Sequence, residues 1–209
     1  MFRRPRLLAA AAALLTLGLA SPALAQRERA VRVRVQTALG DIVLELDAAR
    51  APITTANFLR YVDARHYDGG TFHRTVTMDN QPESTIKIEV IQAGVNPDMA
   101  TSGFEPIALE RTNATGLRHT DGVVSMARDA ADSATSGWFI CINDQPSLDF
   151  GGQRNPDGQG FAAFGRVVSG MDVVRKIQNA PSSTNRTSNS AAQKLTPPIR
   201  VTSVSRLPR

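Results

Sequence analysis

The chain has 209 residues, of which 42% are hydrophobic and 21% are charged, and its formal net charge at pH 7 is +5. This length fits one domain that buries its own core, and the charge is not gathered into a basic helix face, which argues against a nucleic-acid-binding protein. The only cysteine, Cys141, excludes a disulfide within the chain.

The N-terminal segment, residues 1–25, is typical of a secretory signal peptide. Three arginines precede an apolar run, and Ala23 and Ala25 place small residues at cleavage spacing before Gln26. The run is shorter than the roughly 18 uninterrupted apolar residues of a membrane span. We therefore expect residues 26–209 to form one exported domain, periplasmic or else extracellular, without stable membrane insertion.

The exported part is predicted to open with a β-hairpin. Apolar and polar residues alternate over residues 31–46, and the turn falls near Ala38–Asp41. Apolar residues then follow helical spacing from Pro52 to about Arg65, and proline is well tolerated in a first helical turn. A second helix is predicted over Met171–Gln178 from its apolar stripe.

Between these two helices the chain consists of short β-like runs separated by Gly, Asn, Asp and Pro. Residues 180–198 are rich in Ser, Thr, Asn and Pro and are predicted to form a mobile loop before a last strand that begins near Ile199. Many short strands with only two helices predict a mainly β, closed or nearly closed architecture. The intervening strands are expected around Phe72 and over residues 86–92, 122–127, 138–142 and 161–168.

The sequence lacks the motifs of several enzyme classes. It contains no G-x-S-x-G, H-E-x-x-H or G-x-x-x-x-G-K, so a serine hydrolase is a remote alternative. His66, His73 and His119 are too scattered to predict a metal site by spacing. Cys141 lies in an apolar run, which predicts a packed thiol rather than a nucleophile.

A set of short runs, in a fixed order and at compatible spacing, resembles the cyclophilin family over about residues 31–207. Each run is weak alone, but chance would have to reproduce all of them together. The runs are Gly40–Leu46, Ala51-Pro52 with Asn57-Phe58-Leu59, Tyr67-Asp68-Gly69, Phe72-His73-Arg74, Ile91–Gly94, Val124–Arg128, Asp132–Ser136, Phe139-Ile140, Leu148-Asp149, Phe164–Val168 and Gly170–Val174.

The resemblance implies a closed eight-stranded antiparallel β-barrel capped by two α-helices, in agreement with the elements predicted above. It also implies a peptidyl-prolyl cis-trans isomerase that acts on proline-containing unfolded or folding polypeptides and needs no cofactor or metal. Its role would be to assist the folding of exported proteins, and we expect a monomer. Amide resonance sets a rotation barrier of ~18–20 kcal/mol, so such an enzyme must bind the twisted amide more tightly than either planar isomer.

Arg74 is the predicted catalytic residue, because it matches the arginine of the family's Phe-His-Arg motif. A guanidinium carries a permanent charge and several directed donors, so one donor can hold the substrate carbonyl while another approaches the prolyl nitrogen. The alternative for Arg74 is a surface salt bridge. Because the reaction transfers no proton, His73 is not expected to act as a general base.

The resemblance also assigns residues to a substrate groove. Gln92 matches the glutamine that contacts the substrate backbone, and Phe139 falls in the proline pocket. Strand alternation places Phe139 on one face with Gly137 and Cys141. For the apolar members, the alternative is a purely structural place in the core. The predicted substrate-binding residues are Gln92, Val90, Ala127, Arg128, Phe139, Leu148 and Phe161.

The groove region departs from the family pattern in several places. Residues 78–84 are an insertion, and Glu89 stands where the family has phenylalanine, so that Ile88 or Val90 would supply the missing apolar wall. Gly137 replaces a glutamine that contacts substrate. These departures motivate an alternative function, a catalytically weak chaperone module that binds proline-containing peptides.

Overall fold

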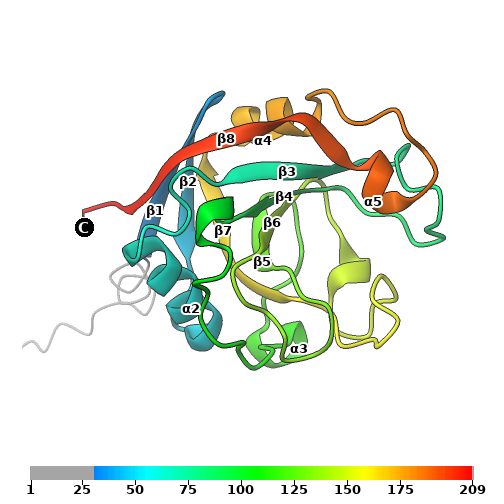
Figure 1. The fold of residues 1–209 in the computed structure, drawn as a ribbon. Helices are drawn as coiled ribbons and strands as arrows, with labels where there is room; N and C mark the ends of the chain where they lie inside the picture. The colour runs from blue at the N-terminus through cyan, green and yellow to red at the C-terminus, as the bar shows by residue number, and fades with distance from the viewer. Residues whose placement is uncertain (1–30, 209) are drawn as a thin grey trace, which may run out of the picture.

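The computed structural model describes residues 31–208, in which eight strands close into an antiparallel barrel (Figure 1). The strand order around the barrel is β1-β2-β7-β5-β6-β4-β3-β8. The predicted mainly β barrel is confirmed, and the predicted signal peptide lies outside the described residues. The strands are β1 (Val31–Thr37), β2 (Gly40–Leu46), β3 (Thr71–Val76), β4 (Val90–Gly94), β5 (Val123–Met126), β6 (Trp138–Cys141), β7 (Ala162–Ser169) and β8 (Lys194–Arg206).

The β1–β2 hairpin forms because apolar and polar residues alternate along both strands. Val33 and Val35 are fully buried, whereas the arginines that alternate with them are exposed. Gly40 has a φ of +130°, and a side chain at this position would approach Val173 Cγ2 to 2.9 Å. The turn therefore depends on glycine both for its backbone conformation and for close packing.

Two helices cover parts of the barrel, as predicted. Helix α2 (Pro52–Asp63) contacts β7 and β8, and α4 (Met171–Gln178) contacts β2, β3 and β4. In Figure 1, α4 lies at the top of the view, and α2 lies at the lower left. None of the helices within residues 31–208 has the length and apolarity needed to cross a membrane. Short helical turns that were not predicted are α3 (Thr112–Thr115), α5 (Asn189–Ala192), η1 (Pro97–Met99) and η2 (Pro146–Leu148).

Aromatic side chains fix α2 to the barrel. The ring of Phe58 lies 5.3 Å from the rings of Tyr67 and Phe164 and 5.6 Å from the ring of Trp138, centre to centre. All four side chains are buried. Because buried aromatic pairs at these separations contribute beyond their area alone, this cluster anchors the helix at the end of the barrel core.

Strand β6 separates two apolar clusters, because its successive side chains point to opposite faces. Trp138 and Ile140 belong to the barrel core, and Phe139 and Cys141 belong to a smaller cluster. This is the division predicted from strand alternation. Burial and three nearby carboxylates raise the pKa of the Cys141 thiol, so it is the packed thiol that was predicted. The other buried members of the smaller cluster are Val76, Ile88, Val90 and Leu148.

The strand predicted over residues 86–92 begins only at Val90, so the prediction is wrong for its first half. The backbone of the preceding residues forms hydrogen bonds with the buried side chain of Gln81 instead. Gln81 Nε2 donates to the Ile88 carbonyl at 2.9 Å, and the Ile88 N–H donates to Gln81 Oε1 at 3.2 Å. A side-chain amide thus satisfies backbone groups that a neighbouring strand would otherwise pair.

The loop predicted over residues 180–198 is wrong in its second half, which contains α5 and the start of β8. Ser188 Oγ caps α5 by accepting from the Ala191 N–H at 3.2 Å. The two prolines of β8 lie between Lys194 and Ile199, the residues that pair with β3 on either side of a register shift. Prolines are tolerated in such an irregular stretch because it needs no ladder donor.

Candidate active site

A groove with a volume of about 390 Å³ lies over the smaller apolar cluster. Strands β3, β4 and β6 form its base, and the segments that follow β5 and η2 form its walls. The structure brings every residue predicted for the site to this groove, whereas the exposed His73 does not line it. The predicted residues that line it are Arg74, Val90, Gln92, Ala127, Arg128, Phe139, Leu148 and Phe161.

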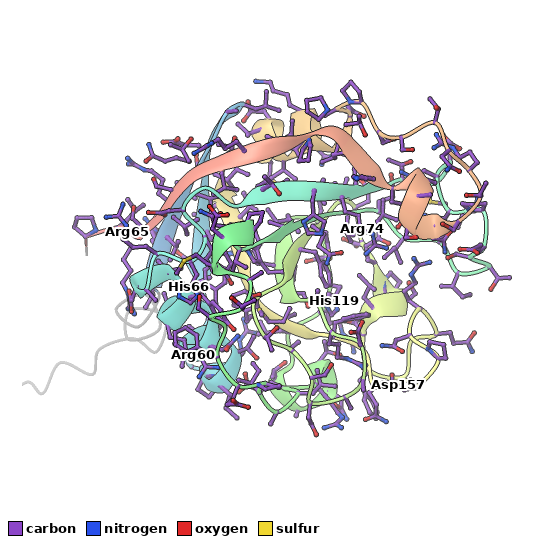
Figure 2. All side chains as sticks on the ribbon, in the orientation of Figure 1. Arg60, Arg65, His66, Arg74, His119 and Asp157 are labelled. Atoms are coloured by element: carbon purple, nitrogen blue, oxygen red, sulfur yellow. The ribbon has the colours of Figure 1, made fainter. Side chains whose placement is uncertain are left out.

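The guanidinium of Arg74 is held in a fixed orientation at this groove. Its Nη1 donates to Gln92 Oε1 at 2.7 Å, and its Nε and Nη2 donate to Gln193 Oε1 at 2.8 and 2.6 Å. Both partners are neutral amides, and within residues 31–208 no carboxylate forms an ion pair with Arg74. The surface salt bridge considered as the alternative is therefore wrong. In Figure 2, Arg74 lies on the same side of the view as His119 and Asp157, away from Arg60, Arg65 and His66.

Gln193 is a site residue that the sequence did not reveal. It is fully buried, and its Nε2 donates to the backbone carbonyl of Asn80 at 3.2 Å. Asn80 belongs to the insertion, and its own Nδ2 donates to the Thr75 carbonyl at 2.9 Å. The insertion at 78–84 therefore supports the side chain that orients Arg74. No local pattern indicates this, because Gln193 is 119 residues from Arg74 and lies in a segment predicted to be a loop.

The setting of Arg74 strengthens its electrostatic effect. Burial and, to a smaller extent, the charge of Arg154 lower the pKa of Arg74 to about 10, which leaves it charged at neutral pH. A charge that is partly removed from water interacts more strongly with a nearby dipole than the same charge in bulk solvent. The fork can therefore act on a carbonyl oxygen or an amide nitrogen placed in the groove.

Two aromatic rings line the apolar part of the groove. Phe139 and Phe161 meet edge to face, with ring centres 5.6 Å apart and an interplanar angle of 87°. Phe139 is 5% exposed and Leu148 is 1% exposed, so both contribute to the core as well as to the groove. The structural and the substrate-binding interpretations of these residues are thus compatible.

The wall left open by Glu89 is completed by its neighbours. The carboxylate of Glu89 points away from the groove, where it accepts hydrogen bonds from Gln178 Nε2 at 3.2 Å and Asn143 Nδ2 at 2.8 Å. Ile88 and Val90 line the groove instead. Successive side chains of an extended segment point to opposite sides, so the residues before and after Glu89 face the groove and make its apolar wall continuous.

The side chain of Arg128 is engaged within the protein. It has no exposed surface, its Nη1 lies 2.7 Å from Asp157 Oδ2, and its Nε donates to the Gly160 carbonyl at 2.8 Å. The guanidinium also lies over the Phe161 ring, 5.1 Å from its centre. Arg128 therefore holds Phe161 and the loop before it in place, and its backbone, rather than its guanidinium, is the part that a peptide in the groove can contact.

Gly137 leaves the groove open beside Gln92. A Cβ atom at this position would lie 3.4 Å from Ala127 Cβ and 4.0 Å from Gln92 Nε2, which are ordinary contact distances. The space around residue 137 would therefore accept a Cβ atom. The absence of a side chain here removes one surface that could touch a bound peptide.

A buried Asp-His-Ser array lies behind the groove and was not predicted. His119 Nδ1 lies 2.8 Å from Asp149 Oδ1, and His119 Nε2 lies 2.9 Å from Ser125 Oγ. Ser125 is fully buried, so its hydroxyl cannot reach a substrate, and the serine hydrolase alternative gains no support. The His119 ring stacks on Phe139, with centres 6.1 Å apart and an angle of 15°. The array therefore supports the back of the apolar pocket.

Asp149 in this array makes stability depend on pH. Burial alone would raise the pKa of the carboxyl, but hydrogen bonds from the His119 ring and backbone, with the charge of Arg118, lower it overall below 3.8. A carboxyl with a lower pKa in the folded state stabilises the fold above its unfolded pKa and loses that contribution as the pH falls. We therefore expect Asp149→Asn to lose less unfolding free energy than the wild type between about pH 5 and about pH 3, measured by urea denaturation.

The matched control for this prediction is Asp98→Asn, because Asp98 is exposed and its carboxylate forms no hydrogen bond within residues 31–208. The control is expected to keep the wild-type pH dependence. If Asp149→Asn also kept it, the proposed coupling between the His119 contacts and acid stability would be wrong.

Comparison with known proteins identifies relatives of this chain. The family model described as "Cyclophilin type peptidyl-prolyl cis-trans isomerase/CLD" matches residues 32–206. Peptidyl-prolyl cis-trans isomerase cyp18 of Streptomyces antibioticus is 39% identical over 156 residues, which cover 74% of this chain and 87% of that protein. Peptidyl-prolyl cis-trans isomerase A of Dickeya dadantii is 38% identical over 173 residues, which cover 82% of this chain and 83% of that protein.

Solved structures show the same fold. A crystal structure of a Cryptosporidium parvum cyclophilin type peptidyl-prolyl cis-trans isomerase has a TM-score of 0.65 and 21% sequence identity, covering 86% of this chain and 99% of that chain. A second structure of that protein, in the presence of the dipeptide Ala-Pro, has a TM-score of 0.64. With a family match over nearly all of the described residues and a closed barrel carrying the expected groove, the chain belongs to the cyclophilin-type peptidyl-prolyl cis-trans isomerases.

Proposed function

We propose that Arg74 catalyses prolyl isomerisation by stabilising the twisted amide in the groove. The proline ring would pack against Phe139, Leu148 and Phe161. As the C–N bond rotates, amide resonance is lost and the nitrogen lone pair becomes able to accept a hydrogen bond from the guanidinium. This hydrogen bond is absent from both planar isomers, so it lowers the barrier rather than merely strengthening binding.

The observation that carries this proposal is the pairing of one fixed guanidinium with an apolar pocket. Gln92 and Gln193 orient Arg74 without neutralising its charge. Gln92 uses its Oε1 for this purpose, and its Nε2 has no hydrogen-bond partner within residues 31–208, so it is available to a substrate carbonyl. The seven predicted substrate-binding residues and the catalytic residue would thus act in one groove.

Catalysis is tested directly by exchange NMR on a short Ala-Pro peptide. Catalytic amounts of the enzyme are expected to broaden or exchange the cis and trans proline signals within the uncatalysed lifetime of tens of seconds. Binding shifts without exchange would support the alternative, a catalytically weak chaperone module. The continuous apolar wall formed by Ile88 and Val90 favours the enzyme.

We further propose that the isomerase is exported, to the periplasm or the extracellular space, and assists the folding of exported proteins as a monomer. The signal-peptide pattern of residues 1–25 supports export, and slow X-Pro isomerisation can limit folding. Cell fractionation with N-terminal sequencing is expected to find a chain that begins at Gln26 outside the cytoplasm. A cytoplasmic chain that retains Met1 would contradict export while leaving the catalytic proposal intact.

A further inference from the structure

The groove contains more positive charge than the proposed mechanism uses. Its lining includes three arginines, Arg74, Arg128 and Arg154, but only one carboxylate, that of Asp129. Arg128 is neutralised by Asp157, which lies outside the lining. Arg74 serves the reaction itself. The charge of Arg154 contributes to lowering the pKa of Arg74, but it does not act on the reacting amide in the proposed mechanism.

Arg154 is fixed at a defined position beside the groove. Its backbone N–H donates to the Ser147 carbonyl at 3.1 Å, and its Nη1 donates to the Ile86 carbonyl at 2.6 Å. Ile86 follows the insertion, and Ser147 belongs to η2, so two segments distant in sequence hold this arginine. The residue is half-buried. A side chain clamped in this way differs from a freely moving surface arginine, because less conformational entropy is lost when it binds a ligand.

Arg154 and Arg74 lack neutralising partners. Neither forms an ion pair with any carboxylate within residues 31–208, and the nearby charge of Arg154 contributes to lowering the pKa of Arg74. Burial likewise lowers the pKa of Arg154. Both arginines line the same partly desolvated groove, so two like charges share one site, which is unfavourable unless an anion joins them.

We propose that Arg154 forms a subsite for an acidic side chain next to the substrate proline. One N–H of its guanidinium is used by Ile86, and the others have no acceptor within residues 31–208. They can therefore donate to a carboxylate, with which a guanidinium forms two parallel hydrogen bonds. The enzyme therefore prefers Glu or Asp to Lys or Arg at a position adjacent to proline. This inference rests on the proposed function, because it concerns the specificity of the same groove.

The experiment compares peptides that differ only in the charge beside proline. One series places Ala, Glu or Lys before proline, and the other places the same residues after it, so that the two ends of the groove are tested separately. In one series, the kcat/KM from exchange NMR is expected to be about 5- to 10-fold higher for the Glu peptide than for the Lys peptide at low salt, falling to about 2-fold or less at about 0.5 M NaCl. Activity on the Ala peptides tests the proposed function independently of charge.

Variants of Arg154 complete the test. The readout is the ratio of kcat/KM for the Glu peptide to kcat/KM for the Lys peptide, which does not depend on the absolute rate. Arg154→Gln is expected to bring the ratio close to 1, Arg154→Glu to reverse it, and Arg154→Lys to retain a ratio above 1 because the charge remains. Arg34→Gln, an exposed arginine on β1 outside the groove, is the control and keeps the wild-type ratio. A wild-type ratio within about 2-fold of 1 in both series would overturn the proposal, as would an unchanged ratio in Arg154→Gln.

Discussion

Replacing Arg74 with alanine is expected to lower kcat/KM for a prolyl peptide about 100- to 1,000-fold, the range seen when one preorganised transition-state donor is removed. The physical reason is that the guanidinium contacts the prolyl nitrogen only while the amide is twisted. The loss should therefore fall on kcat, with little change in KM. The measurement is exchange NMR or a protease-coupled assay with the same peptide for both proteins.

Two further variants separate this mechanism from simpler explanations. Arg74→Lys retains the charge but loses the planar fork, and it is expected to recover only a small part of the activity. Arg34→Ala removes an exposed arginine of β1 and is expected to behave as wild type. Retention of most of the activity by Arg74→Ala, in a protein with wild-type near-UV circular dichroism, would show that another group performs the catalysis.

Gln193→Leu is expected to lower kcat by about 10- to 100-fold, corresponding to the loss of hydrogen bonds to a charged group at about 1.5–3 kcal/mol. Gln193 Oε1 accepts from both Nε and Nη2 of Arg74, and it is the only acceptor for these two atoms within residues 31–208. Without it the guanidinium is held only through Nη1, so the fork is no longer aimed at one position. Gln193 touches Arg74 rather than the groove and is therefore a positioning residue.

A double-mutant cycle distinguishes positioning from a general structural role. If Gln193 acts through Arg74, Gln193→Leu has almost no further effect on kcat once Arg74 is alanine. The matched control is Gln36→Leu, since Gln36 Oε1 also accepts a side-chain hydrogen bond, from Ser203 Oγ at 2.6 Å, and neither residue lines the groove. Additive losses in the double variant would mean that Gln193 affects catalysis by some route other than Arg74.

Much of the site could be predicted from the sequence because short motifs carry the resemblance to the family, and because strand alternation divides the side chains of β6 between two faces. The alternation along β6 placed Phe139 apart from Trp138, and the structure confirms that division. The departure from the family pattern at Glu89 suggested that Ile88 or Val90 would supply the missing apolar wall, and both line the groove. The predictions fail at residues 86–89, where the backbone bonds to the buried Gln81 side chain, and at residues 189–198, where a short helix and an irregular strand form despite a loop-like composition.

The sequence by itself determined the hairpin, the two main helices, the barrel class and the identity of Arg74 as the candidate, because these depend on periodicity over a few residues and on short motifs. Only the tertiary structure decided which groups satisfy one another. Gln193 contacts Arg74 across 119 residues of the chain, and Arg154 is held by the Ile86 carbonyl across 68 residues. In the buried array, His119 contacts Asp149 across 30 residues and Ser125 across 6. Buried polar groups find their hydrogen-bond partners when the barrel closes and excludes water. These partners lie far apart in the chain, so local sequence patterns do not predict them.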